Sequence, residues 1–139
     1  MEKTIQVVAR VFLAHIFILA GLSKVSAYAG TQQYMESMGI PGILLPMVIL
    51  LEVVAGLALL LGWQTKIMAA MLAGFSIMAA VIFHANFADQ MQMILFMKNI
   101  SIAGGLLMLV SYGAGAYSLD NRKSKTRMIN ESVDSQLSL

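Results

Sequence analysis

The sequence predicts an all-α membrane protein, folded as an antiparallel four-helix transmembrane bundle. Hydrophobic residues make up 59% of the 139 residues, and charged residues only 12%. That charged fraction is about half of what soluble proteins carry. The mean hydropathy is +0.80. Four apolar stretches are long enough to cross a hydrocarbon core of about 30 Å, and a chain of this length has room for one domain.

The first expected span covers residues 5–24 and carries Arg10 and His15. At 100° per residue, His15 lies off the helical face that contains Arg10. A signal peptide cleaved after Ala29 is a second interpretation, because Ala27-Tyr28-Ala29 has the small-x-small pattern of such sites. Arg10 weighs against it, since it interrupts the apolar region. The face shared by Arg10 is expected to be Arg10, Ala14, Phe17, Gly21 and Lys24.

The second expected span, residues 43–62, carries one acid, Glu52, near its middle. A carboxylate at that depth costs about 2.5–3.5 kcal/mol on insertion scales unless it is paired or protonated. The polar stretch before it, residues 28–39, is expected to form a short interfacial helix, since tyrosines favour the headgroup level. That helix should end before Pro41, because a residue preceding proline is pushed out of the helical region.

The third expected span, residues 67–84, follows the second after the short turn Trp63–Lys66. Helices joined by so short a turn must be antiparallel neighbours. Small residues recur along the third span at helical spacing, and such a face lets helix backbones approach closely in lipid. These residues are Ala69, Ala73, Ser76 and Ala80.

The fourth expected span covers residues 99–117 and completes a membrane domain over residues 1–120. The stretch 84–99 is apolar enough either to lie in the interface or to begin this helix. Residues 121–139 carry four basic side chains and no apolar period, so they predict a disordered basic tail.

The distribution of Lys and Arg predicts the orientation. Most basic residues fall on the side of both termini and of the Trp63–Lys66 turn, whereas Lys24 and Lys98 fall on the other. The positive-inside rule therefore predicts that both termini are cytoplasmic.

With this topology the polar residues converge on the bundle axis. Glu52 is expected to form the floor of a polar pocket, with Arg10 as its counter-charge from below. Glu52 and His84 are the candidate proton-transfer residues. The candidate ligand-binding residues are Arg10, Lys24, Lys98 and Asn99.

Each of these residues also has a purely structural interpretation. Glu52 could fix helix register through a buried ion pair, the two lysines could extend to headgroups, and His84 could be a satisfied interface histidine. No metal site is predicted, because one histidine and one carboxylate at different depths are too few ligands. There is no cysteine and no soluble basic surface, so thiol chemistry and nucleic-acid binding have no support.

These residues, in this order and spacing, resemble the DoxX family of small membrane proteins. The resemblance covers roughly residues 5–121 and includes Arg10, Gly21-x-x-Lys24, Gly39-x-Pro41, Glu52, Gly62, His84, Lys98-Asn99 and Gly104-Gly105. It implies a four-helix bacterial inner-membrane protein. Some members are linked to thiosulfate–quinone oxidoreduction or to complexes with soluble redox enzymes. Quinone is therefore the candidate cofactor.

Two classes of function follow. In the first, the pocket binds a quinone and the protein is the membrane subunit of an oxidoreductase. In the second, the bundle does no chemistry and is a small-molecule or lipid carrier, or a scaffold for partner proteins. Besides the lipid bilayer, a homo-oligomer or a redox partner subunit would be compatible with so small a bundle.

Overall fold

The structure, a computed structural model, describes residues 1–138 and contains six α-helices and no strand in that range. Four helical segments are long and apolar enough to cross a membrane: α1, η1 with α3, α4 and α5. This confirms the predicted all-α membrane bundle. The elements are α1 (Glu2–Ser26), α2 (Tyr28–Ser37), the 3-10 turn η1 (Gly42–Leu44), α3 (Leu45–Leu61), α4 (Thr65–Phe83), α5 (Gln90–Tyr112) and α6 (Leu119–Leu137).

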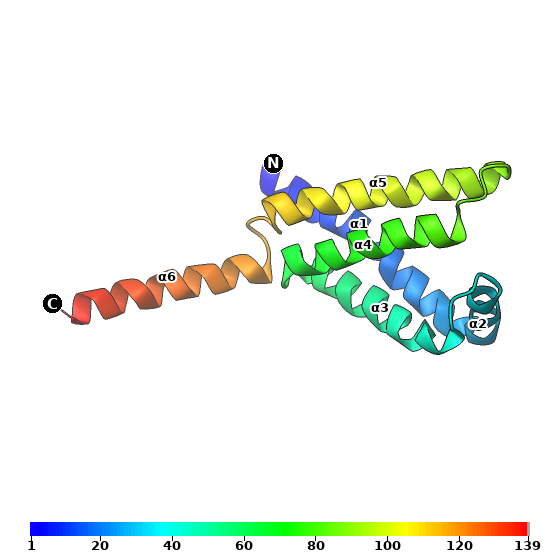
Figure 1. Cartoon of the computed structure of the whole chain (residues 1–139). Coiled ribbons are helices and arrows are strands. Elements are labelled where there is room, and N and C mark those ends of the chain that lie inside the picture. Colours follow the sequence, from blue (N-terminus) through cyan, green and yellow to red (C-terminus); the bar gives the residue numbers. More distant parts are fainter. Residues whose placement is uncertain (139) are drawn as a thin grey trace.

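The bundle has two distinct ends (Figure 1). Helix α2 and the α4–α5 loop lie at one, here called the α2 end. The N-terminus, the α3–α4 turn and the start of α6 lie at the other, here called the tail end. The most extensive packing joins α1 to α3 and α4 to α5, with a smaller contact between α3 and α4. The bundle is thus two helix pairs placed against each other.

Glycines set the close approach of α1 and α3. A Cβ built on Gly21 would lie 2.6 Å from Val53 Cγ2, and one on Gly56 would lie 2.8 Å from Ile18 Cγ1. The Gly56 position also faces backbone, with Ile18 N at 3.3 Å. Backbones this close gain dispersion contacts that lipid tails do not offer. The α1–α3 spacing therefore depends on the absence of side chains at these two positions.

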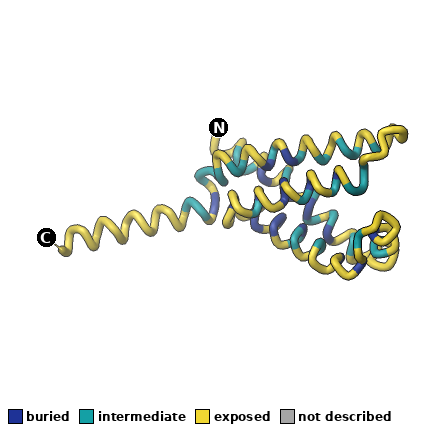
Figure 2. The backbone as a smooth tube through the Cα atoms, viewed as in Figure 1, coloured by how far each residue is buried: buried dark blue, intermediate teal, exposed yellow. Residues whose placement is uncertain are grey.

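The well-packed core occupies the half of the bundle nearer the tail end (Figure 2). The four small residues expected on the third span are all buried on α4. The structure thus places them on an inward face, as the spacing predicts. The core is formed by Ala14, Phe17, Ala55, Leu59, Ala69, Leu72, Ala73, Ala103 and Leu106.

The last spanning helix differs from the expected range 99–117, since α5 covers Gln90–Tyr112. It begins earlier because the Asp89 side chain accepts a hydrogen bond from the Met91 N–H at 2.9 Å, which caps the helix. It ends earlier because Gly113 has φ +78°, a left-handed conformation that stops a helix. The apolar stretch before residue 99 therefore belongs to the helix and not to a separate interfacial segment.

The C-terminal segment also differs from the expectation of a disordered tail over 121–139. Residues 119–137 form α6, while Leu139 lies outside the described residues. The Ser118 hydroxyl accepts a hydrogen bond from the Asn121 N–H at 3.2 Å and so caps the helix. Arg127 pairs with Glu131 one turn later. These two local signals support a helix without any apolar period. Figure 2 shows α6 exposed along almost its whole length.

Residue Asp120 fastens α6 to the bundle. Its carboxylate accepts hydrogen bonds from the Gln64 N–H at 2.8 Å and the Thr65 N–H at 3.0 Å, at the start of α4. Its own N–H donates to the Gly62 carbonyl at 2.9 Å. An acid at a helix N-terminus satisfies free N–H groups and the helix dipole together. A residue 55 positions later in the chain therefore caps α4.

Arg10 belongs to the same assembly. It is 2% exposed and donates through Nη2 to the Tyr117 carbonyl. Gly62 has φ +69° and lies directly against the guanidinium, so a larger residue there would displace Arg10. Arg10 therefore ties α1 to the α3–α4 turn and to the segment before α6. We call Arg10, Gly62, Tyr117, Ser118 and Asp120 the tail-end lock.

The glycine at the α1–α3 contact can be tested against one that faces open space. Gly56→Ala is expected to lower the thermal unfolding midpoint in detergent, because overpacking costs about 1–3 kcal/mol. Gly74→Ala is the matched control, since a Cβ there meets nothing within 4 Å. It should leave the midpoint unchanged or raise it. Equal midpoints for the two variants would contradict the close α1–α3 approach.

The tail-end lock should respond to acid. Burial raises the pKa of Asp120, but the N–H donors of Thr65 and Gln64 and the nearby Lys123 outweigh it, so this pKa lies below its usual range. Because the pKa of Asp120 is lower in the folded state, its stabilisation of the fold is complete above the unfolded-state pKa of about 3.9. This stabilisation is lost as pH falls through the folded-state pKa. Trp63, beside this contact and the sole tryptophan, should report the change by fluorescence below about pH 4. An Asp120→Ala variant that shows the same acid transition would contradict this assignment.

Candidate functional site

A cavity of about 270 Å³ occupies the half of the bundle nearer the α2 end. All four spanning helices and α2 contribute to its walls. It contains five of the six site residues predicted from the sequence, and it lacks Arg10. Those five are Lys24, Glu52, His84, Lys98 and Asn99. The half of the bundle at the tail end is thus densely packed, and the half at the α2 end contains the cavity.

Glu52 and Lys24 form an ion pair in this cavity. Lys24 Nζ lies 2.9 Å from one carboxylate oxygen of Glu52 and 3.0 Å from the other. The Glu52 side chain is 4% exposed and the Lys24 side chain 28%. Gly21 brings α1 against the Glu52 position, and Lys24 follows on the same helical face. Lys24 therefore extends inward to the acid and not to the headgroups.

The expected counter-charge was wrong. Arg10 does not pair with Glu52, because it is held in the tail-end lock by the Tyr117 carbonyl. The helical face of Arg10, Ala14, Phe17 and Gly21 is buried as predicted. What the sequence did not reveal is the depth at which each cation on that face meets a partner. Lys24, near the end of α1, reaches Glu52, whereas Arg10, two turns before Phe17, lies too near the tail end.

His84 ends α4 and faces α5 across the cavity. Its Nδ1 lies 2.7 Å from Gln92 Oε1. With the proton assigned to Nδ1, the neutral ring donates to Gln92 and leaves Nε2 as an acceptor. His84 therefore stays a candidate proton-transfer residue. Gln92, which contacts this ring nitrogen, was not identified in the sequence analysis.

Lys98 and Asn99 enter the cavity from α5. Asn99 Nδ2 donates to the Leu95 carbonyl of its own helix at 3.0 Å. Lys98 has no carboxylate within 4.0 Å among residues 1–138. Its ammonium group is therefore the cation of this cavity that an incoming acceptor oxygen could engage.

Aromatic side chains complete the walls, and sequence reasoning did not assign them. Phe17, Phe75 and Phe83 line the cavity from α1 and α4, and Tyr34 lines it from α2. The rings of Tyr34 and Phe83 stack with centroids 5.6 Å apart at 29°. Tyr34 was expected only at the headgroup level; its contact with Phe83 depends on how α2 folds back, which no local pattern encodes.

The cavity combines the Lys24–Glu52 ion pair at its floor, an acceptor nitrogen on His84 and the ammonium group of Lys98 within apolar walls. Among residues 1–138 no three His, Cys, Asp or Glu side chains are grouped so as to hold a metal ion. His15 lies exposed on α1, away from the cavity, with Nδ1 2.6 Å from the Phe12 carbonyl. The cavity therefore places hydrogen-bonding and titratable groups together within apolar walls, and their roles in binding and proton transfer stay predictions.

The ion pair can be tested by a double-mutant cycle. Lys24→Met should lower the free energy of unfolding by about 3–5 kcal/mol, because it leaves Glu52 buried and unpaired. Glu52→Gln alone should cost less, since the partly exposed Lys24 can turn to water. Adding Glu52→Gln to Lys24→Met should restore stability. Detergent unfolding measures all four proteins; an equal loss from Glu52→Gln in both backgrounds would show that the two residues are not coupled.

Comparison with known proteins agrees with this architecture. Residues 5–85 match the DoxX family. The chain is 50% identical over 125 residues to the inner membrane protein YqjF of Escherichia coli (strain K12), which covers 90% of this chain and 96% of YqjF. It is 38% identical over 122 residues to the inner membrane protein YphA of the same organism, covering 83% of this chain and 87% of YphA. No solved structure matches the chain. The family match covers more than half of the sequence, and YqjF aligns along nearly its whole length: the chain belongs to the DoxX family and is an integral inner-membrane protein.

Proposed function

We propose that this protein is the membrane subunit of a quinone-linked oxidoreductase system and that its cavity receives the quinone headgroup. The observation that carries the proposal is the cavity itself, which places Glu52–Lys24, His84 and the free Lys98 within aromatic and aliphatic walls. A quinone headgroup is a flat ring with acceptor oxygens, and it needs hydrogen-bond donors in apolar surroundings. The residues present fit that requirement.

The size of the cavity limits what can enter it. At about 270 Å³ it lies just below the usual range of ligand pockets, roughly 300–1,000 Å³. It can hold a single ring but not a long isoprenoid tail. A membrane-facing groove of about 480 Å³ runs between α3 and α4, with almost entirely apolar walls. Val48 lines both the groove and the cavity, so a molecule with a polar head and an apolar tail has a place for each part.

Each polar residue then has a role in binding or proton transfer. Lys98 donates to an acceptor oxygen of the ring, and His84 exchanges a proton through Nε2 while Gln92 holds Nδ1. Lys24 holds Glu52 in place through the ion pair, and Glu52 can accept a proton if that pairing loosens. A bound quinone would supply two-electron, two-proton chemistry. The chain has no cysteine, so the electrons would have to come from a redox partner subunit.

Both termini are proposed to face the cytoplasm. Lys3, Lys66 and the basic residues of α6 belong to the tail end, and the positive-inside rule assigns that end to the cytoplasm. The cavity would then lie in the outer half of the membrane. A homo-oligomer would be compatible with the exposed apolar faces of the four helices.

A tail-length comparison tests the ligand class. The purified protein in nanodiscs should bind a long-tailed quinone more tightly than its short-chain analogue, by fluorescence titration of Trp63 or by calorimetry. Lys98→Gln should weaken both ligands by about tenfold or more, since a hydrogen bond from a charged donor contributes about 1.5–3 kcal/mol. If neither quinone binds, the proposal fails and the non-enzymatic carrier or scaffold becomes the better account.

A second substitution tests the tail site alone. Val54 lines the groove but not the cavity. Val54→Trp should weaken the long-tailed quinone about tenfold and leave the short-chain analogue unaffected. Val81→Trp is the matched control, because Val81 faces lipid on α4 outside both spaces. Equal effects of the two tryptophans would show that the tail does not use this groove, while binding of the headgroup would still stand.

A further inference from the structure

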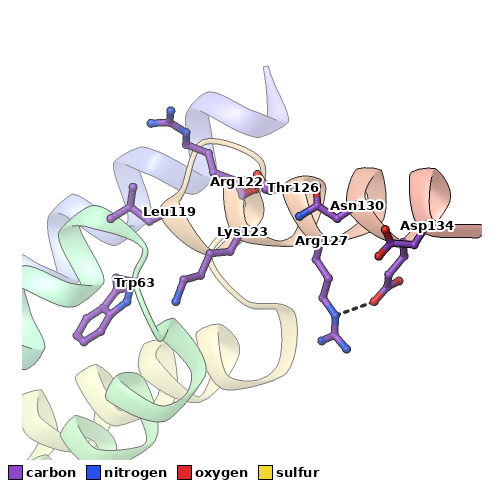
Figure 3. Close-up of a pocket in the computed structure, with 9 residues that line it drawn as sticks. Trp63, Leu119, Arg122, Lys123, Thr126, Arg127, Asn130 and Asp134 are labelled. Carbon is purple, nitrogen blue, oxygen red and sulfur yellow. Dashed lines mark hydrogen bonds and ion pairs between the residues drawn. The ribbon is translucent and has the colours of Figure 1, made fainter. Parts of the chain in front are cut away.

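A second binding feature lies at the tail end, where the first turns of α6 meet Trp63 (Figure 3). An open groove of about 690 Å³ runs there along one side of α6; basic residues line the part near Trp63, and the acids Glu131 and Asp134 line the far part. Trp63, in the α3–α4 turn, is the bundle residue that lines it, and it is 40% exposed. Lys123 extends from α6 in the direction of Trp63, and Arg127 follows one turn further along. We call Trp63, Lys123, Thr126 and Arg127 the α6-root groove.

The charges of α6 are separated along its length. Its four basic residues lie between positions 122 and 127, and its acids after Asp120 are Glu131 and Asp134. The basic stretch rises only about 8 Å along the helix, whereas Glu131 lies about 14 Å beyond Arg122. The Debye length at physiological ionic strength is about 8 Å. Because α6 extends away from the bundle (Figure 1), its basic half lies nearer the tail end than its acidic half, and Glu131 lies more than one Debye length beyond Arg122.

The basic side chains near Trp63 are not all engaged by the protein. Arg127 pairs with Glu131 at 2.9 Å. Lys123 has no carboxylate within 4.0 Å among residues 1–138. The neighbouring acid, Asp120, is occupied by the two N–H groups at the start of α4. Lys123 therefore has no direct ion-pair partner among residues 1–138, although its charge acts on Asp120, and it lines the groove together with Trp63.

We propose that the α6-root groove binds the phosphate of an anionic phospholipid from the leaflet at the tail end. Lys123 contacts the phosphate, Arg127 adds positive charge from the next turn, and the Trp63 indole packs against the glycerol region. Tryptophan favours this level of the bilayer because one edge of its ring is apolar and its N–H is polar. A lipid headgroup fits better than a soluble partner, because a tryptophan and basic side chains just beyond the ends of membrane spans are typical of the headgroup level.

The test compares two lysines of the same helix. Wild type, Lys123→Gln and Lys125→Gln are purified in detergent and titrated with short-chain phosphatidylglycerol or phosphatidylcholine, and bound lipid is counted by native mass spectrometry. Lys125 carries the same charge but does not line the groove. Phosphatidylglycerol should bind the wild type and bind Lys123→Gln about fivefold more weakly, the effect of one lysine near an anionic surface. Lys125→Gln should remain within about twofold of wild type.

Two results would overturn the proposal. Equal weakening by both substitutions would show a diffuse attraction with no defined groove. Equal binding of phosphatidylglycerol and phosphatidylcholine to the wild type would show that charge is not recognised. Trp63→Phe provides a second readout, because it keeps an apolar ring and removes the indole N–H; it should weaken phosphatidylglycerol less than Lys123→Gln does. Circular dichroism checks that α6 is retained in each variant.

Discussion

The ion pair between Lys24 and Glu52 is the interaction on which the hollow half of the bundle depends. Without a partner, a carboxylate this deeply buried would have to be neutral or reach water, because an unpaired charge at that depth is costly. Lys24 reaches it because Gly21 lets α1 approach α3 without side chains between them. The pair thus joins two helices, neutralises the cavity floor and leaves the other polar groups of the cavity available.

The two halves of the bundle are packed differently. Toward the tail end, small and branched side chains fill the space between the two helix pairs. Toward the α2 end, aromatic rings and polar groups surround a space that they do not fill. Alanines on α4 belong to the densely packed half, and longer side chains on the same helix, such as Phe75 and Phe83, line the cavity in the other half. One helix therefore serves both packing and the cavity.

Much of the fold and part of the site could be predicted from the sequence. Hydropathy gave the four spans, and helical spacing gave the buried faces of α1 and α4, since both depend only on local periodicity. The pairing of Glu52 with Lys24 and not with Arg10 could not be predicted, because it depends on how far α1 extends and how α1 lies against α3. Gln92 and Tyr34 were missed for the same reason: each meets its partner only through the tertiary arrangement. The α6 helix was missed because capping and a single ion pair replace the apolar period.

The tail-end lock has a consequence for how the chain is assembled. The free N–H groups that begin α4 receive their acceptor from a residue made 55 positions later, and the buried Arg10 of α1 receives its carbonyl from Tyr117. Both groups can therefore acquire these partners only after Tyr117 and Asp120 have been synthesised. A protein shortened before Asp120 would keep its four membrane crossings yet lack the clasp that closes them. A fluorescent domain fused after Leu137 would leave that clasp intact.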